Sequence, residues 1–94
     1  MTQAIWNNTV IAQSDQTETL EGSQYFPPDS VQPEYLQANS LTTVCGWKGT
    51  ANYYDVVVDG EKNEAAAWQY ADPKAEAAQI KGYIAFWKGV SIVE

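Results

Sequence analysis

The segment from residue 50 to residue 70 constrains the fold most strongly, because it predicts a β-hairpin. Thr50–Val58 is rich in β-branched and aromatic residues, which favour a strand. Asp59-Gly60 follows, and these residue types suit a two-residue hairpin turn. Glu64–Tyr70 then returns as the paired strand, although its three consecutive alanines also permit a helix. The segment therefore indicates an antiparallel sheet.

Shorter segments elsewhere continue the β pattern. Asn7-Asn8 lies between two apolar runs and predicts a tight hairpin, since asparagine tolerates positive φ. Thr17–Glu21 is predicted to be an edge strand, and Pro27-Pro28 ends any ladder because proline donates no backbone hydrogen bond. Further strands are expected over residues 41–44, 83–87 and 90–93. We expect about seven or eight short strands in all.

Only one helix longer than a single turn is expected. Asp72 is suited to cap a helix, and Pro73 to occupy its first position, so we predict one short α-helix near residues 73–81. Gly82 would end it. A shorter helical turn is expected over residues 31–36, with a connector over residues 37–40. The fold class is therefore mainly β.

Size and charge narrow the functions open to the chain. Ninety-four residues form one domain, 1–94. Five lysines and no arginine face twelve acidic residues, a net charge of −7, which argues against nucleic acid or an anionic membrane as partner. The absence of histidine excludes a Ser-His-Asp triad, a Cys-His dyad and a histidine-ligated metal site within one chain. Asp55 with Asp59 is a weak metal signal, so no metal site is predicted.

Cysteine usage and the N-terminal residues set the expected compartment. The single cysteine cannot form an intramolecular disulfide. The first residues show neither a charged segment nor a long apolar run of the kind that signal peptides carry. We expect a cytoplasmic protein by default, and a homo-oligomer is compatible with the sequence.

Residues 42–55 concentrate the reactive and aromatic side chains of the chain. Gly46 and Gly49 bracket Trp47-Lys48, so the backbone can turn sharply there and approach a ligand closely. We expect the segment Cys45–Tyr54 to border the main pocket, with Lys48 as its positive group. A small anionic or planar ligand suits a lysine flanked by rings.

Each of these side chains also has a simpler interpretation. Lys48 could be a solvated loop lysine. Cys45 could be a thiolate activated by Lys48, but a buried small apolar residue is favoured. Trp68 and Tyr70 point the same way along their strand and could line a ring-stacking pocket or form the core. We expect Trp68 and Trp87 in the core and Trp47 as the ligand-facing ring.

Four segments together resemble a known family. The chain is similar to small single-domain proteins catalogued as a domain of unknown function, some with a provisional nucleotidyltransferase label. The signature is Cys-x-Trp-Lys-Gly-x-Ala-x-Tyr-Tyr, and the resemblance covers nearly the whole chain in the same order. It implies a tent-like fold of bent antiparallel sheets with one short helix, and it implies little about activity. The segments are residues 25–31, 43–54, 67–73 and 80–86.

The resemblance also bears on individual positions. The family usually has proline after the cysteine, where this chain has Gly46, and often has arginine in the N-terminal hairpins, where this chain has none. If that arginine holds a phosphate in relatives, the function here is altered or absent. The positions that match the family motif are Cys45, Lys48, Gly49, Tyr53, Trp68, Tyr70 and Pro73.

Three classes of function remain, in order of preference. The first is a small-ligand binding domain, the second a structural or protein-interaction module that uses exposed edges, and the third a transferase-type enzyme. In the enzyme, Lys48 would hold an anion and Tyr53 or Tyr54 would donate a proton; catalytic residues and a cofactor are otherwise unknown. The candidate ligand-binding residues are Cys45, Trp47, Lys48, Gly49, Tyr53, Trp68 and Tyr70.

Overall fold

Nine strands in three antiparallel sheets make up the computed structural model, which describes residues 1–94. The fold is mainly β and forms a single domain, as the sequence predicts. The largest sheet has the order β5-β6-β7-β8, the second β2-β1-β9, and the third is the hairpin β3-β4. The strands are β1 Thr2–Trp6, β2 Thr9–Ser14, β3 Glu18–Leu20, β4 Ser23–Tyr25, β5 Leu36–Cys45, β6 Gly49–Val58, β7 Glu61–Gln69, β8 Ile84–Phe86 and β9 Ser91–Val93.

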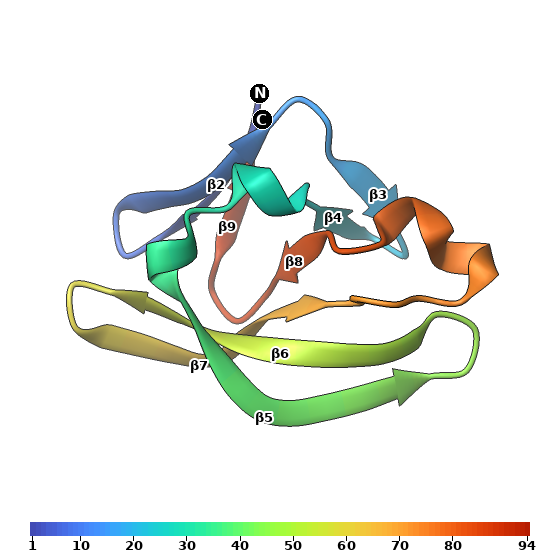
Figure 1. Cartoon of the computed structure of the whole chain (residues 1–94). Helices are drawn as coiled ribbons and strands as arrows, with labels where there is room; N and C mark the ends of the chain where they lie inside the picture. The colour runs from blue at the N-terminus through green and yellow to red at the C-terminus, as the bar shows by residue number, and fades with distance from the viewer.

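The sheets are arranged like a tent (Figure 1). The β5–β7 strands form the floor, and the β1-β2-β9 sheet and the β3-β4 hairpin rise over it from opposite sides. Both termini lie at the top, where β1 pairs with β9. Phe26 and Ile84 exchange backbone hydrogen bonds of 2.8 and 2.9 Å, which ties the end of β4 to β8. This link brings the β3-β4 hairpin over the far half of the floor.

The hairpin turns follow from residue types that accept positive φ. Asn7 and Asn8 have φ of 51° and 59°, and Asp59 and Gly60 have φ of 51° and 78°. Both predicted turns are therefore confirmed. Glu21 and Gly22 form a third turn of this kind, with φ of 51° and 80°. The segment Glu64–Tyr70 is extended through Gln69, which resolves its helix-or-strand ambiguity in favour of the strand.

The predicted α-helix near residues 73–81 is instead a 3-10 helix, η3, over Ala75–Ile80, interrupted at Ala77. Asp72 does not cap it: the capping position belongs to Lys74, and no side chain makes the capping hydrogen bond. Tertiary hydrogen bonds explain the difference. Gly82 donates to the carbonyl of Tyr70, and the Lys74 amide donates to the carbonyl of Lys48. These bonds confine the segment to a short closed loop that a regular α-helix would not fit.

Two further helical turns and one strand differ in extent from expectation. The 3-10 helices η1, Pro28–Ser30, and η2, Pro33–Tyr35, follow the diproline, so the predicted turn over residues 31–36 is shorter than expected. The expected connector over residues 37–40 is wrong, because these residues belong to β5. Strand β5 pairs with β6 on both sides of a register shift between Ala38 and Thr42.

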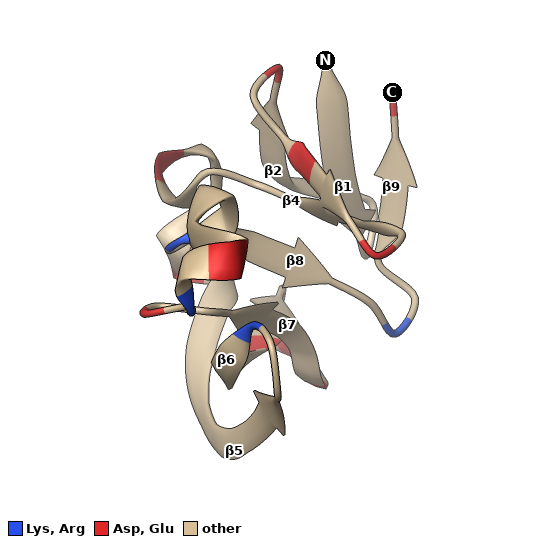
Figure 2. Ribbon diagram, turned by 90° about the vertical axis from the view of Figure 1, so that its right-hand side faces the viewer, with Lys and Arg blue, Asp and Glu red and all other residues tan.

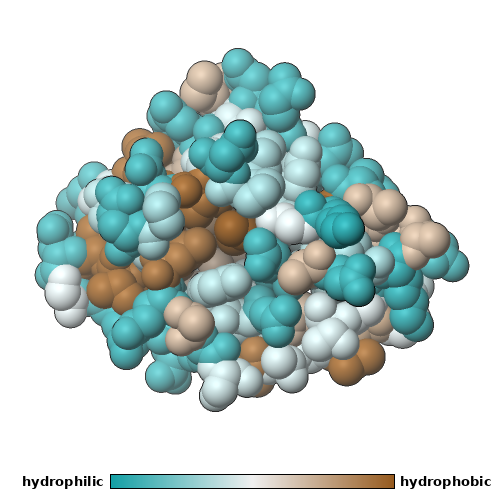
Figure 3. Space-filling model, in the orientation of Figure 1, coloured by the Kyte–Doolittle hydropathy of each residue, from teal (hydrophilic) through white to brown (hydrophobic).

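Two hydrophobic clusters fill the space under the tent. The inter-sheet cluster lies between the β1-β2-β9 sheet and the floor, and its residues are Ala4, Ile11, Ala12, Phe26, Val31, Val56, Val58, Ala66, Ala67, Ile84 and Phe86. The pocket-side cluster lies under the β3-β4 hairpin and η3, and its residues are Tyr25, Ala51, Tyr70, Ala77, Ile80 and Ala85. Figure 3 shows the apolar material reaching the surface where the β1-β2 hairpin approaches the floor.

Charged residues lie mostly in turns and connecting segments (Figure 2). Only Lys48 and Asp55 are buried among the charged residues. None of the helical segments has the length and apolar character needed to cross a membrane.

Candidate functional site

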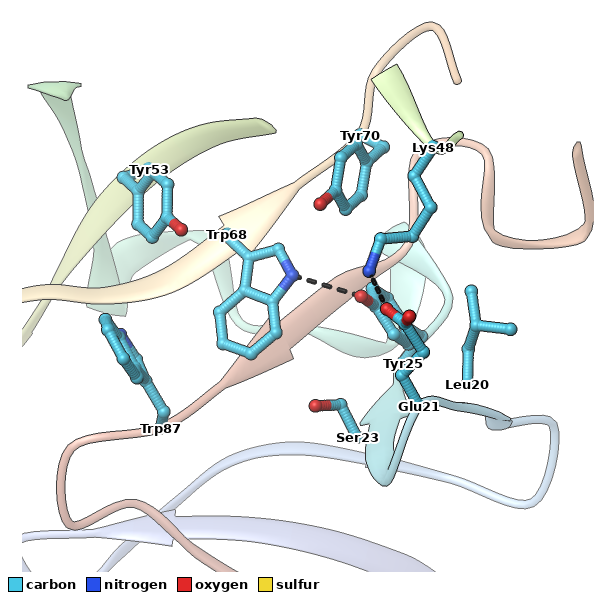
Figure 4. Close-up of a pocket in the computed structure, with 9 residues that line it drawn as sticks. All are labelled: Leu20, Glu21, Ser23, Tyr25, Lys48, Tyr53, Trp68, Tyr70 and Trp87. Atoms are coloured by element: carbon cyan, nitrogen blue, oxygen red, sulfur yellow. Dashed lines mark hydrogen bonds and ion pairs between the residues drawn. The ribbon is translucent and has the colours of Figure 1, made fainter. Parts of the chain in front are cut away.

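A cavity of about 240 Å³ opens between the β3-β4 hairpin and the floor of the tent (Figure 4). Six of its nine lining residues are hydrophobic, and five of them carry aromatic rings. They come from four separate parts of the chain, so the cavity exists only in the folded protein. The lining residues are Leu20, Glu21, Ser23, Tyr25, Lys48, Tyr53, Trp68, Tyr70 and Trp87.

Strand pairing explains how the first two rings meet. Tyr53 on β6 lies directly opposite Trp68 on β7, and their ring centroids are 6.4 Å apart at 36°. Opposite side chains on neighbouring antiparallel strands share one face of the sheet. On its other side Trp68 pairs with Ala85 of β8, which is fully buried. A methyl group at that position leaves space beside the indole that a larger side chain would fill.

Trp68 stands at the centre of the aromatic lining. Its ring meets Tyr25 edge-on at 6.1 Å and 89°, and Trp87 at 5.9 Å and 82°. Its Nε1 donates a hydrogen bond of 3.1 Å to the hydroxyl of Tyr25, which fixes the ring orientation. Edge-to-face contacts are favourable for aromatic pairs. Rings at right angles form walls of a hollow, whereas parallel stacking would close it.

The polar end of the cavity holds one buried cation. The Lys48 side chain is only 10% exposed and forms an ion pair with Glu21, whose side chain is 52% exposed. The Lys48 Nζ also lies 5.4 Å from the ring centroid of Trp47 and 5.6 Å from that of Tyr70. Rings at this distance stabilise an ammonium through their negative faces.

The ion pair keeps both partners charged at neutral pH. Burial acts to lower the pKa of Lys48, but the hydrogen bond to Glu21 and the nearby tyrosine and cysteine side chains outweigh it, so that pKa is raised. The hydrogen bond from Lys48 lowers the pKa of Glu21. Burial raises the pKa of the Tyr70 hydroxyl, which therefore remains protonated. Lys48 and Glu21 therefore cancel each other's charge at the polar end of the cavity.

The loop that carries Lys48 is fixed from behind by residues before η3. The Lys74 amide donates to the Lys48 carbonyl at 2.8 Å, and the Lys74 Nζ donates to the Gly46 carbonyl at 2.7 Å. Gly49 has φ of 114°, and a side chain there would meet Pro73 and Lys74 at 3.6 Å. Contacts at this distance are ordinary van der Waals contacts, so the positive φ is what favours glycine at this position.

The structure brings together four of the seven predicted site residues. Lys48, Tyr53, Trp68 and Tyr70 all line the cavity. Lys48 is not the solvated loop lysine of its simpler interpretation: it is buried and paired with Glu21, because the β3-β4 hairpin covers it.

The other three predicted residues lie outside the lining. Cys45 is half-buried against the pocket-side cluster, and Gly49 packs on Pro73 and Lys74. Trp47, expected as the ligand-facing ring, contacts the Lys48 ammonium without lining the cavity. Trp87, expected in the core, is 47% exposed and lines the cavity. Its Nε1 donates a hydrogen bond to the carbonyl of Ala65 on β7, which holds the ring in this position.

Sequence reasoning missed the contribution of the β3-β4 hairpin, which supplies Leu20, Glu21, Ser23 and Tyr25 to the lining. The predicted edge strand Thr17–Glu21 contains β3, but nothing in the sequence places the hairpin over Lys48. That placement depends on the bonds between Phe26 and Ile84 described above.

The acidic residues considered for acid-base or metal chemistry lie elsewhere. Asp55 accepts hydrogen bonds of 2.8 Å from Asn39 and from the Ala65 amide, so it satisfies groups where the β6-β7 pairing is irregular. Tyr54 donates its hydroxyl to Gln69 at 3.0 Å. No three His, Cys, Asp or Glu side chains are grouped closely enough to hold a metal ion.

Fold and cavity together define a small mainly β domain with one aromatic-lined cavity that has an ion pair at its polar end. A family model described as "Domain of unknown function (DUF427)" and labelled NTP_transf_9 matches residues 1–94. The chain belongs to this family, as its sequence motifs indicate. No curated protein matches the chain.

Proposed function

We propose that this domain binds a small flat molecule between the rings of the cavity. The observation that carries the proposal is the hollow itself: five aromatic rings and one buried ammonium surround about 240 Å³ of open space. Protein interiors are normally packed to the density of organic crystals. A domain of this size gains stability by closing such a space, so an open ring-lined cavity favours a binding role.

The size of the cavity limits the ligand. Ligand pockets usually measure about 300–1,000 Å³, and this one, at about 240 Å³, lies below that range. It suits one or two fused rings better than a nucleoside triphosphate. The lining also has one carboxylate, and the chain no arginine, whereas nucleotidyl transfer needs convergent acids for Mg²⁺. Binding is therefore preferred over transferase activity.

The test compares two exposed tryptophans that differ in position. A neutral bicyclic probe, 2-naphthamide, is titrated into ¹⁵N-labelled protein while backbone and indole resonances are followed. We expect shifts at Trp68, Tyr53 and Trp87, and a loss of affinity of up to about tenfold in Trp87→Ala, since an aromatic contact is worth about 0.5–1.5 kcal/mol. Trp47→Ala is the matched control and should bind normally.

Two results would count against the proposal. One is the absence of any shift up to the solubility limit of the probe and of a panel of similar bicyclic fragments. The other is an equal loss of affinity in Trp47→Ala and Trp87→Ala, because the rings lining the cavity would then have no special part in binding.

A second function, self-association, is favoured by one observation. Strand β5 is an edge of the four-stranded sheet and has ten residues without a single charged side chain, in a chain of net charge −7 (Figure 2). Natural sheet edges are usually protected by charges, proline or short length. We propose that β5 pairs with β5 of a second copy, because an uncharged edge is the part of the surface where two acidic chains repel least.

The oligomeric state tests this second proposal. Val44 on β5 is 79% exposed, so Val44→Lys adds an edge charge without disturbing the core. We expect light scattering after size exclusion to give a dimer for the original chain and a monomer for Val44→Lys. Val10→Lys, on the exposed edge strand β2, is the control and should remain dimeric. A monomer at all concentrations would contradict the proposal.

A further inference from the structure

We propose that the ligand of this pocket is a flat carboxylic acid, and that its carboxylate takes the place of Glu21 at the Lys48 ammonium. This inference rests on the proposed binding function and adds the chemical class of the ligand. Glu21 would thus be a stand-in that neutralises Lys48 while the pocket is empty and moves to solvent when the acid binds.

The first argument is the unequal burial of the two partners. The Lys48 side chain is 10% exposed and the Glu21 side chain 52%. Lys48 is therefore fixed within the fold, whereas half of Glu21 already faces water. Removing Glu21 from the ammonium leaves its carboxylate well solvated, but it leaves Lys48 buried and needing another anion.

The second argument concerns stability. Burying an ammonium carries a desolvation penalty, which the hydrogen bond to Glu21 and the neighbouring side chains offset. Apolar residues of similar size often replace a buried ion pair without loss. Folding alone therefore does not require a lysine at position 48, and its presence inside a ring-lined cavity points to an anion that it meets there.

The third argument is geometric. Figure 4 shows the Glu21 carboxylate and the Lys48 ammonium meeting at the edge of the cavity, beside Tyr25 and across from Trp68. An ammonium has three donors, and Lys48 Nζ donates a hydrogen bond to Glu21 alone. A carboxylate at this place would receive the same donors while an attached ring lies among Trp68, Trp87 and Tyr53.

The position of Glu21 in the chain allows it to leave. It is the first residue of the two-residue turn between β3 and β4, a hairpin held by three paired positions. Rotation of its side chain into solvent needs no change in the core, because the buried Tyr25 and the Phe26–Ile84 bonds hold the base of the hairpin.

A matched pair of probes tests the inference: 2-naphthoate carries the carboxylate, and 2-naphthamide has the same shape without charge. Both are titrated by NMR into the original chain, Glu21→Gln and Lys48→Met. We expect Glu21→Gln to bind naphthoate about tenfold more tightly, because a hydrogen bond to a charged group is worth about 1.5 kcal/mol or more. Naphthamide affinity should change less than twofold, and Lys48→Met should lose naphthoate selectively.

Glu18→Gln is the control, since Glu18 is an exposed acid on the same hairpin. It removes one negative charge, as Glu21→Gln does, and should leave naphthoate affinity unchanged; an increase equal to that of Glu21→Gln would overturn the inference. Equal affinities of the two probes in every variant would also overturn the inference, but they would leave the proposed binding function intact. If neither probe binds any variant, the proposed function fails as well. Thermal melts of Glu21→Gln and Lys48→Met establish that each variant is folded.

Discussion

The two hydrophobic clusters share one floor but are built from different residues. The inter-sheet cluster consists of aliphatic side chains and two phenylalanines, whereas the pocket-side cluster also contains Tyr25 and Tyr70; the members of both are at most 7% exposed. The pocket-side cluster is smaller, and half-buried Leu20, Tyr53 and Trp68 surround it. Phenylalanine and valine fill space and have no polar tip to satisfy. Tyrosine and tryptophan keep one end polar, so they suit a cluster that remains open to water.

Each half of the molecule also contains one buried charge, and the two are held differently. Asp55 accepts two short hydrogen bonds, from the Asn39 side chain and the Ala65 amide, and its Oδ2 lies 3.9 Å from the Nζ of Lys62. Lys48 has one ion-pair partner, which is half-exposed. The proposals above therefore assign Asp55 to the stability of the fold and Lys48 to ligand binding. The following changes test that division, from the largest expected effect to the smallest.

The strongest test compares one ring from each half. Phe26 is completely buried and contacts Phe86 edge-on at 5.7 Å, so Phe26→Ala should lower the free energy of unfolding by about 3–5 kcal/mol. Trp87 is half-exposed, and Trp87→Ala should lower it by about 1–2 kcal/mol. Urea denaturation measures both. Equal losses would mean that the two clusters contribute alike to stability.

The buried charges are compared next. Asp55→Ala leaves the Asn39 amide and the Ala65 N–H without an acceptor, so we expect a loss of about 3 kcal/mol. Lys48→Met keeps the volume and leaves Glu21 in water, so stability should change by no more than about 1 kcal/mol. Chemical denaturation at neutral pH measures both changes. A large loss of stability in Lys48→Met would show that the ion pair stabilises the fold.

Acid titration adds a pH dependence to the Asp55 comparison. Burial acts to raise the pKa of Asp55, but the hydrogen bonds from Asn39 and Ala65 and the charges of Lys62 and Lys88 outweigh it and lower that pKa. A lowered folded-state pKa contributes stability above the ordinary Asp pKa, which is lost as pH falls through the folded value. The free energy of unfolding should therefore decrease below about pH 4, and decrease less in Asp55→Asn.

The smallest effect concerns the loop that carries Lys48. Gly49 has φ of 114°, so Gly49→Ala should lower the free energy of unfolding by about 1–2 kcal/mol through backbone strain. Gly46 lies in the same loop with open space around it, and Gly46→Ala should stay within about 0.5 kcal/mol. Thermal denaturation of the pair is the measurement. A similar loss at both positions would show that loop flexibility, and not the backbone strain at position 49, matters.

Local residue chemistry by itself determined the β class and the main hairpins. Asn7-Asn8 and Asp59-Gly60 adopt the positive φ that their residue types allow, and the runs beside them are strands. Composition also excluded histidine-based catalysis and disulfide closure. The motif around Lys48 and the segment of residues 67–73 indicated the family and four residues of the cavity. These properties depend on single residues or near neighbours, which is why the sequence is sufficient for them.

Tertiary structure alone decided which side chains meet. Lys48 and Glu21 are 27 positions apart, and only the docking of the β3-β4 hairpin on β8 makes them an ion pair. Trp87 lines the cavity in place of Trp47, and both rings are exposed, because exposure depends on neighbouring elements. The helix capped by Asp72 gave way to η3, since hydrogen bonds to Lys48 and Tyr70 outweigh a local capping preference. Contacts between distant segments are set by packing of the whole chain, which no local pattern encodes.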